Sequence, residues 1–310
     1  MKILFLGSAD FGCPTLTRLV RSEHQVCGVV TTPPKPKGRG RKPAQSPIEK
    51  RARELGVTDI LTPLELDDSA LRGSLSRFAA DIFVVVAFRI LPESLFSIPP
   101  LGTVNIHASL LPAYRGAAPI QRAVEAGETR TGITVFRIDK RVDTGRIILQ
   151  RATAIGPKET TPDVYKRLAE LAPDVLMESL EMLSRSTAVF VPQNDALASK
   201  APKLRKEEAH IDWKAPATLL FNRIRAFKPF PGACTDADGT RLGIEWAEPS
   251  SDPVDQAEPG TVIVVGRDHF DVACGSGSLR VWEVKPAGRH AMSVEAYLRG
   301  HRLREGMLLR

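Results

Sequence analysis

The sequence predicts an α/β protein in which a doubly wound, mostly parallel sheet is followed by a small C-terminal β-barrel. Strand-like and helix-like segments alternate through the first half, whereas residues 207–310 hold mostly short strands at turn-like spacing. The segment 81–87 is apolar at every position after Asp81, which is typical of a central parallel strand buried on both faces. At 310 residues and 43% hydrophobic composition, two domains are expected. We place them at 1–188 and 207–310, joined by a basic linker at 189–206.

Local signals define the elements of the first domain. The motif Ser46-Pro47-Ile48-Glu49 supplies an N-cap, a first-turn proline and a capping-box glutamate, so a helix is expected to about residue 55. Residues 33–45 alternate Pro and Gly with Lys and Arg and have no apolar anchor, so a loop is expected there. The other expected elements are strands at 2–6, 25–31, 103–107, 132–138 and 146–152, and helices at about 14–21, 117–126 and 162–184.

The second domain has one helix signal, at about residues 215–226, followed by Pro/Gly-rich residues 229–232. Several short strand signals at turn-like spacing predict the small barrel. These strands are expected at residues 234–235, 242–246, 261–265, 269–273 and 279–285.

Composition excludes several classes of protein. No stretch approaches the roughly 18 to 20 apolar residues that span a bilayer, and residues 1–7 are too short for the apolar part of a signal peptide. The four cysteines are widely spaced, without a Cys-x-x-Cys motif or paired histidines, so neither a zinc site nor a disulfide framework is expected. We therefore expect a cytoplasmic protein with no membrane segment and no metal.

Positive charge is concentrated in two places. Residues 33–53 hold eight basic residues against one acidic residue, Glu49, and the linker carries Lys200, Lys203, Arg205 and Lys206. Most charge runs are solvated surface, and that interpretation remains open for the loop. The alternative is a polyanionic partner, with nucleic acid the natural candidate, that meets the protein at this loop and linker.

Three polar residues form a candidate catalytic set. Asn105 and His107 lie two positions apart in an expected strand, so their side chains point to the same face. Asp143 lies in a tight Val-Asp-Thr-Gly turn. Taken singly, they could be a strand-end cap, a structural histidine and a turn residue. Together they could stabilise an oxyanion and move a proton during acyl transfer to an acceptor that supplies its own amine.

The chain resembles the 10-formyltetrahydrofolate-dependent formyltransferases. The motifs that carry the resemblance are Asn105-x-His107-x-Ser109-Leu110-Leu111-Pro112, Tyr114-Arg115-Gly116-Ala117-Ala118-Pro119-Ile120, Asp143-Thr144-Gly145, Gly38-Arg39-Gly40-Arg41-Lys42 and residues 203–213. They are most similar to members that act on initiator methionyl-tRNA. The resemblance implies a Rossmann-like domain, a barrel of oligonucleotide-binding (OB) type, 10-formyltetrahydrofolate as co-substrate without a metal, and formylation of initiator methionyl-tRNA. We also expect the protein to be a monomer.

The resemblance also assigns roles to residues. Asn105, His107 and Asp143 are the implied catalytic set. The implied folate contacts are Ser109, Leu110, Leu111, Pro112, Ala87, Phe88 and Ile90. The implied tRNA contacts are Arg39, Arg41, Lys42, Lys203, Arg205 and Lys206. One departure is Arg89, since the family usually has a glycine after the aromatic residue; its charge is expected to alter the pterin pocket or to lie near the folate glutamate tail.

Two alternatives remain open at this point. The first is the same chemistry on a small substrate, as in glycinamide ribonucleotide or amino-sugar formyltransferases or a formyltetrahydrofolate hydrolase. Such an enzyme gives no reason for eight basic residues in 33–53. The second is a non-catalytic RNA-binding protein on an α/β scaffold, which would bind tRNA and ignore folate.

Overall fold

The computed structural model describes residues 1–37, 42–67, 69–250 and 257–310. The chain divides into two compact units. The first contains residues 1–119, 130–154 and 165–201, and the second contains residues 120–129, 155–164 and 202–310. The domain boundaries expected at residues 188 and 206 stay a prediction.

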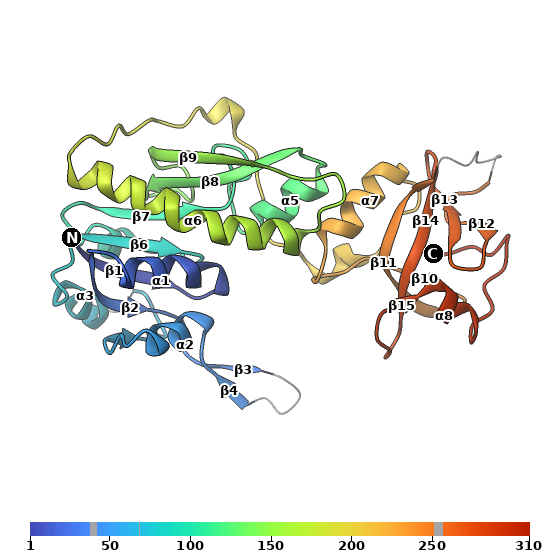
Figure 1. Cartoon of the computed structure of the whole chain (residues 1–310), viewed down its shortest axis with the longest axis horizontal. Coiled ribbons are helices and arrows are strands. Elements are labelled where there is room, and N and C mark those ends of the chain that lie inside the picture. Colours follow the sequence, from blue (N-terminus) through green and yellow to red (C-terminus); the bar gives the residue numbers. More distant parts are fainter. Residues whose placement is uncertain (38–41, 68, 251–256) are drawn as a thin grey trace. The chain divides into compact units, whose positions relative to one another are not determined.

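A seven-stranded sheet is the centre of the first unit (Figure 1). Its strands follow the order β5-β2-β1-β6-β7-β8-β9; the pairs from β5 to β7 are parallel, and β8 and β9 are antiparallel to their neighbours. The predicted α/β sheet is thereby confirmed. The strands are β1 (Lys2–Gly7), β2 (Gln25–Val30), β5 (Ile60–Leu61), β6 (Ile82–Val86), β7 (Thr103–His107), β8 (Arg130–Arg137) and β9 (Ile147–Ala154).

The helices also follow the sequence signals. Ser46 caps α2, as predicted, because its Oγ accepts a hydrogen bond from the backbone N–H of Glu49 at 2.9 Å. The expected reciprocal capping-box bond is replaced: Oε1 of Glu49 accepts from Gln45 and Arg53. The helices are α1 (Cys13–Val20), α2 (Pro47–Glu54), α3 (Ser69–Ser76), α4 (Glu93–Phe96), α5 (Pro119–Glu125) and α6 (Thr161–Ser184).

The expected loop at residues 33–45 is wrong in part. The strands β3 (Lys35–Lys37) and β4 (Lys42–Ala44) pair antiparallel, with Pro36 opposite Pro43. Proline fixes φ near −65°, which suits extended backbone and explains why a Pro-rich segment forms short strands. The elements β5, α3 and α4 were not expected from the sequence; β5 has two residues and α4 has four, too few for a periodic pattern.

The buried strand β6 pairs with β7, the strand that carries Asn105 and His107. All five of its residues are buried, as the apolar run predicts, and its partners include Val85 opposite Asn105 and Val86 opposite Ile106. The carboxyl ends of β6 and β7 therefore lie side by side, where parallel α/β sheets bind their ligands.

The second unit contains an antiparallel sheet with the order β10-β11-β14-β13-β12, and β15 pairs with β14 (Figure 1). This sheet encloses a core that includes Phe270, Val281 and Leu220. The elements are α7 (Ala217–Ala226), β10 (Cys234–Ala237), β11 (Thr240–Ser250), β12 (Val262–Val265), β13 (Phe270–Ala273), β14 (Ser278–Pro286), β15 (Met292–Ser293) and α8 (Val294–Leu298). Of these, β15 and α8 were not expected.

The last residues of the chain join the two edges of this sheet. Arg310 and Asp236 of β10 exchange backbone hydrogen bonds in both directions, and the N–H of Leu309 donates to the carbonyl of Gly260, just before β12. The sheet is thereby closed toward a small barrel, in agreement with the predicted class. Among the helices of the described residues, none combines the length and the apolar character needed to cross a membrane.

Candidate active site

Strand β7 presents Asn105 and His107 on one face. Asn105 lies opposite Val85 of β6 and Phe136 of β8, and His107 lies opposite Thr134 of β8, so the register of the sheet fixes their positions. His107 is buried, with 6% of its side chain exposed, whereas Asn105 is half-buried. No hydrogen bond joins the Asn105 carboxamide to another residue in the described part of the chain. Its N–H donors are therefore available to a ligand.

Both ring nitrogens of His107 face oxygen atoms. Nε2 is 2.9 Å from the carbonyl oxygen of Tyr114, and Nδ1 is 3.7 Å from Oδ2 of Asp143. Because a carbonyl oxygen only accepts, Nε2 carries the proton of this hydrogen bond. The backbone thus holds the ring on one side, and a carboxylate faces it on the other. The surroundings of the imidazole are therefore polar.

The turn that carries Asp143 brings its carboxylate to His107, as the sequence predicts. Asp143 has φ of +55°, a left-handed conformation that aspartate adopts more readily than most residues. Its Oδ2 accepts a hydrogen bond from the N–H of Gly116 at 2.9 Å. Two residues on, only glycine fits at 145, because a Cβ there would overlap the Arg137 carbonyl oxygen.

The backbone of residues 114–116 holds both catalytic candidates. The carbonyl of Tyr114 accepts from His107, and the N–H of Gly116 donates to Asp143. The Tyr-Arg-Gly motif was the only available signal, because backbone contacts of this kind have no side-chain signature.

Two of the residues expected to contact folate are buried and form hydrogen bonds within the protein. Ser109 is fully buried, and its Oγ donates to the Ala113 carbonyl at 2.6 Å. Leu111 is also buried, and its N–H donates to Oγ1 of Thr134 at 3.1 Å. Leu110 and Pro112 are half-buried, so they present side-chain surface from the same loop.

The segment after β6 offers exposed apolar surface. Ala87 is exposed with φ of +48°, Phe88 is half-buried, and Ile90 is 75% exposed. An apolar side chain this exposed at the carboxyl end of a central strand suits a flat aromatic ligand.

Arg89 contacts the backbone of the 63–64 loop and the neighbouring Phe88 ring. Its Nη1 and Nη2 donate to the carbonyls of Leu64 and Pro63, each at 2.7 Å, and its guanidinium carbon lies 5.4 Å from the centroid of the Phe88 ring. The guanidinium therefore fixes the 63–64 loop, and the effect of its charge on the folate pocket stays a prediction.

The expected tRNA contacts are only partly described. Arg39 and Arg41 lie outside the described residues, and Lys42 begins β4. Lys203, Arg205 and Lys206 are all exposed. The basic linker is therefore accessible to a polyanion.

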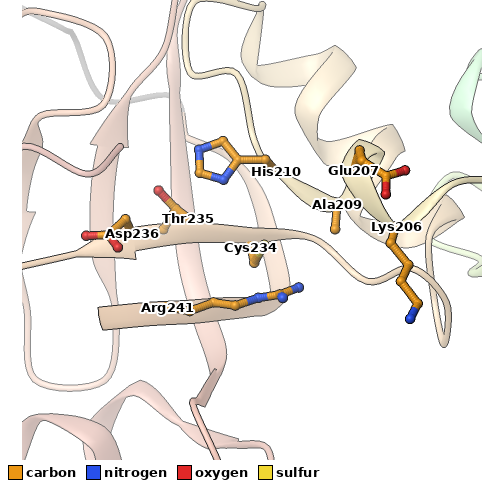
Figure 2. Close-up of a pocket in the computed structure, with 8 residues that line it drawn as sticks. All are labelled: Lys206, Glu207, Ala209, His210, Cys234, Thr235, Asp236 and Arg241. Carbon is orange, nitrogen blue, oxygen red and sulfur yellow. The ribbon is translucent and has the colours of Figure 1, made fainter. Parts of the chain in front are cut away.

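A pocket in the second unit lies apart in sequence from the catalytic candidates. Its volume is about 280 Å³, and Figure 2 shows basic Lys206 and Arg241 among its lining side chains together with acidic Glu207 and Asp236. None of the expected catalytic or folate residues lines it. Within the described ranges, no group of three or more His, Cys, Asp or Glu side chains is placed to hold a metal ion.

Comparisons with known proteins agree along the whole chain. Residues 1–180 match the family described as Formyl transferase, and residues 203–302 match Formyl transferase, C-terminal domain. A methionyl-tRNA formyltransferase of Geobacter metallireducens is 41% identical over 310 residues, covering 100% of this chain and 98% of that protein. Its counterpart in Methylococcus capsulatus is 42% identical over 304 residues and covers 98% of each chain.

Among solved structures, WlaRD, a sugar 3N-formyl transferase crystallised with dTDP and 5-N-formyl-THF, has a TM-score of 0.68. The likeness covers 94% of this chain and 99% of that one at 17% sequence identity. At this identity, it shows the shared fold alone.

Proposed function

The chain belongs to the formyl transferase family, and from this premise we propose that it formylates initiator methionyl-tRNA for translation initiation. The formyl group comes from 10-formyltetrahydrofolate and is transferred to the α-amine of the methionine. Relatives named methionyl-tRNA formyltransferase, at 41% and 42% identity over nearly the full length of both chains, support this assignment.

The juxtaposition of Asn105, His107 and Asp143 carries the mechanism. The amine nitrogen attacks the formyl carbon, a C–N bond forms, and the carbonyl oxygen becomes an oxyanion. The carboxamide of Asn105, free of other described partners, donates to that oxygen. The bond between the carbon and N10 of the folate then breaks, and the proton lost by the amine passes to N10.

His107 is the residue that moves this proton. Its Nε2–H is engaged with the Tyr114 carbonyl. For transfer, this proton leaves Nε2 for N10 of the folate, and the proton lost by the amine takes its place on the ring. Asp143 faces the other nitrogen at 3.7 Å and orients the ring. Asn105 is then the donor to the oxyanion, and His107 moves the proton.

The folate co-substrate fits the carboxyl ends of β6 and β7. The residues proposed to contact it are Ser109, Leu110, Leu111, Pro112, Ala87, Phe88 and Ile90. Exposed Ile90 and half-buried Phe88 supply apolar surface, as do half-buried Leu110 and Pro112, while the side chains of Ser109 and Leu111 are buried. Ser109 and Leu111 therefore act by shaping the loop, through their bonds to Ala113 and Thr134, more than by touching the pterin.

The tRNA is proposed to meet the basic loop, at Arg39, Arg41 and Lys42, and the linker. Exposed Lys203, Arg205 and Lys206 on the linker support this. Small acceptors do not need such charges, so the alternative of a small-molecule formyltransferase is disfavoured. We further propose that the protein acts as a monomer in the cytoplasm.

The test is formyl transfer by the purified protein from 10-formyltetrahydrofolate to charged initiator tRNA at low and high salt. If about four phosphates are contacted, tRNA affinity should fall roughly a hundredfold between 50 and 200 mM salt. Arg39→Ala should weaken tRNA affinity further, whereas Arg185→Ala, which removes the same charge from an exposed pair with Glu181, should not. If neither the salt concentration nor the Arg39→Ala change alters formyl transfer, the proposal of a tRNA substrate is contradicted.

A further inference from the structure

Residues 193–201, which we name the strap, run along the loop that holds the catalytic candidates. Backbone bonds join the two segments: Arg115 N–H donates to the Ser199 carbonyl at 2.9 Å, and Ala201 N–H donates to the Arg115 carbonyl at 2.7 Å. The N–H of Tyr114 also donates to Oγ of Ser199 at 2.9 Å. The strap thus pairs with Tyr114 and Arg115, in the loop whose backbone holds His107 and Asp143.

Gln193, at the start of the strap, reaches the Asp143 turn directly. Its Nε2 donates to the carbonyl of Asp143 at 3.0 Å and to the carbonyl of Gly145 at 2.8 Å. Both N–H donors of one carboxamide are therefore used on two carbonyls of one tight turn. Since Asp143 has φ of +55°, such bonds select the conformation that presents its carboxylate to the imidazole.

The other end of the Gln193 carboxamide is fixed by Arg115. Nε and Nη2 of Arg115 donate to Oε1 of Gln193 at 3.0 and 2.7 Å, and Nη2 also lies 2.8 Å from Oδ1 of Asp195. The hydrogen bond from Arg115 lowers the pKa of the Asp195 carboxyl, so that carboxylate remains charged opposite the guanidinium. The Arg115 side chain is 14% exposed, so this contact is partly shielded from water.

We propose that Gln193 is a positioning residue for formyl transfer: anchored by Arg115, it holds the Asp143 turn so that the carboxylate stays against His107. This inference rests on the proposed function, because it acts through the proposed catalytic pair. Gln193 lies about 50 residues after Asp143 in the chain and touches neither His107 nor Asn105 in any described contact.

The most direct test is Gln193→Glu, which keeps the size of the side chain and an oxygen for Arg115. It replaces the amide that donates to two carbonyls with an acceptor that repels them. We expect kcat to fall about tenfold to a hundredfold, as small misplacements at a site do, while KM for the folate and for tRNA changes less than about threefold. Gln193→Met, of similar length and without a donor, should give the same pattern.

Asn194→Asp is the matched control. It adds the same negative charge one residue away and keeps the cap, since Oδ1 of Asn194 accepts from the N–H of Ala196. Its kcat should equal that of the unmodified protein. A comparable fall in Asn194→Asp would overturn the proposal, because charge and not the hydrogen bonds would then be the cause.

A double-mutant cycle distinguishes positioning from general structural damage. In an Asp143→Asn background, Gln193→Glu should lower kcat little further, because both changes disable the same contact. Full additivity of the two effects, or normal kcat in Gln193→Glu with an unchanged melting temperature, would overturn the inference. If the unmodified protein transferred no formyl group to tRNA, the proposed function would fail instead, and the two failures are distinguishable.

Discussion

Asp143 uses one oxygen atom for two contacts. Oδ2 accepts from the Gly116 N–H at 2.9 Å and lies 3.7 Å from Nδ1 of His107. A carboxylate oxygen can accept more than one donor, so the backbone can fix the carboxylate without using up its capacity toward the imidazole. At the scale of single residues, the proposed site is therefore an ordered chain of contacts from backbone to carboxylate to ring.

Replacement of Asp143 by asparagine tests the charge in this chain of contacts. The amide oxygen of Asn can still accept from Gly116, but the negative charge beside His107 is lost. We expect kcat for formyl transfer to fall by about two orders of magnitude with little change in melting temperature. Asp174→Asn, at an exposed residue, is the control, because it removes the same negative charge away from the proposed site and should leave kcat unchanged. Near-normal turnover in Asp143→Asn would rule out this role.

Other single residues show how a polar side chain near the site can be structural. Ser109 is fully buried and bound to Ala113, and Arg89 fixes the carbonyls of Pro63 and Leu64. Each side chain satisfies backbone groups of a loop at the carboxyl end of a strand. The functional interpretation of a residue is thus stronger for Asn105, which has no such described partner.

Among the elements, β13 and β14 carry a buried ion pair between cross-strand neighbours. Asp271 is fully buried and lies opposite Arg280. Nε and Nη2 of Arg280 donate to the two carboxylate oxygens at 2.9 and 2.8 Å. This bidentate geometry compensates the desolvated carboxylate and fixes the register of the two strands.

Removal of the arginine should therefore destabilise the second unit strongly. In Arg280→Ala the Asp271 carboxylate stays buried without its bidentate partner, and we expect a loss of about 3 to 5 kcal/mol in the free energy of unfolding. Arg299→Ala breaks an exposed pair with Glu295 and should lose less than about 1 kcal/mol. Urea denaturation of both variants measures the difference, and equal losses would contradict the argument.

Across the whole molecule, both units hold buried or half-buried thiol and phenol groups whose pKa values are raised. Burial is the largest cause for Cys13, Cys27 and Tyr165 in the first unit, and for Tyr297 in the second. Burial also raises the pKa of Cys274 to about 12, from its usual 9.0. Each group is therefore held in its neutral form by the folded protein.

These shifts predict alkaline destabilisation. A raised folded pKa contributes stability that is fully present below the unfolded value and is lost as pH rises toward the folded value. For Cys274 the window is from about 9 to about 12, and the loss approaches about 1.4 kcal/mol per pH unit within it. Urea midpoints at pH 8 and pH 10.5 test this, with Cys274→Ala as the control. If the urea midpoint of Cys274→Ala fell by the same amount between the two pH values, Cys274 would not be the source of the alkaline destabilisation.

The sequence by itself determined the two architectures and the elements that carry the site. The apolar run at 82–86, the cap at Ser46 and the two-residue spacing of Asn105 and His107 are local features, and local backbone preferences with periodicity decide elements of this kind. The short strands β3 and β4 were missed, because their Pro-rich segment has no apolar alternation.

Only the tertiary structure decided which groups meet. Tyr114 with His107, Gly116 with Asp143 and Gln193 with the Asp143 turn are contacts between atoms that are 7, 27 and 50 residues apart in the chain. Several of these partners are backbone groups. Because every residue has them, the residue type gives no indication that they take part in a contact. Such contacts depend on the path of the folded chain, so the residue types could predict the reacting groups but not what holds them in place.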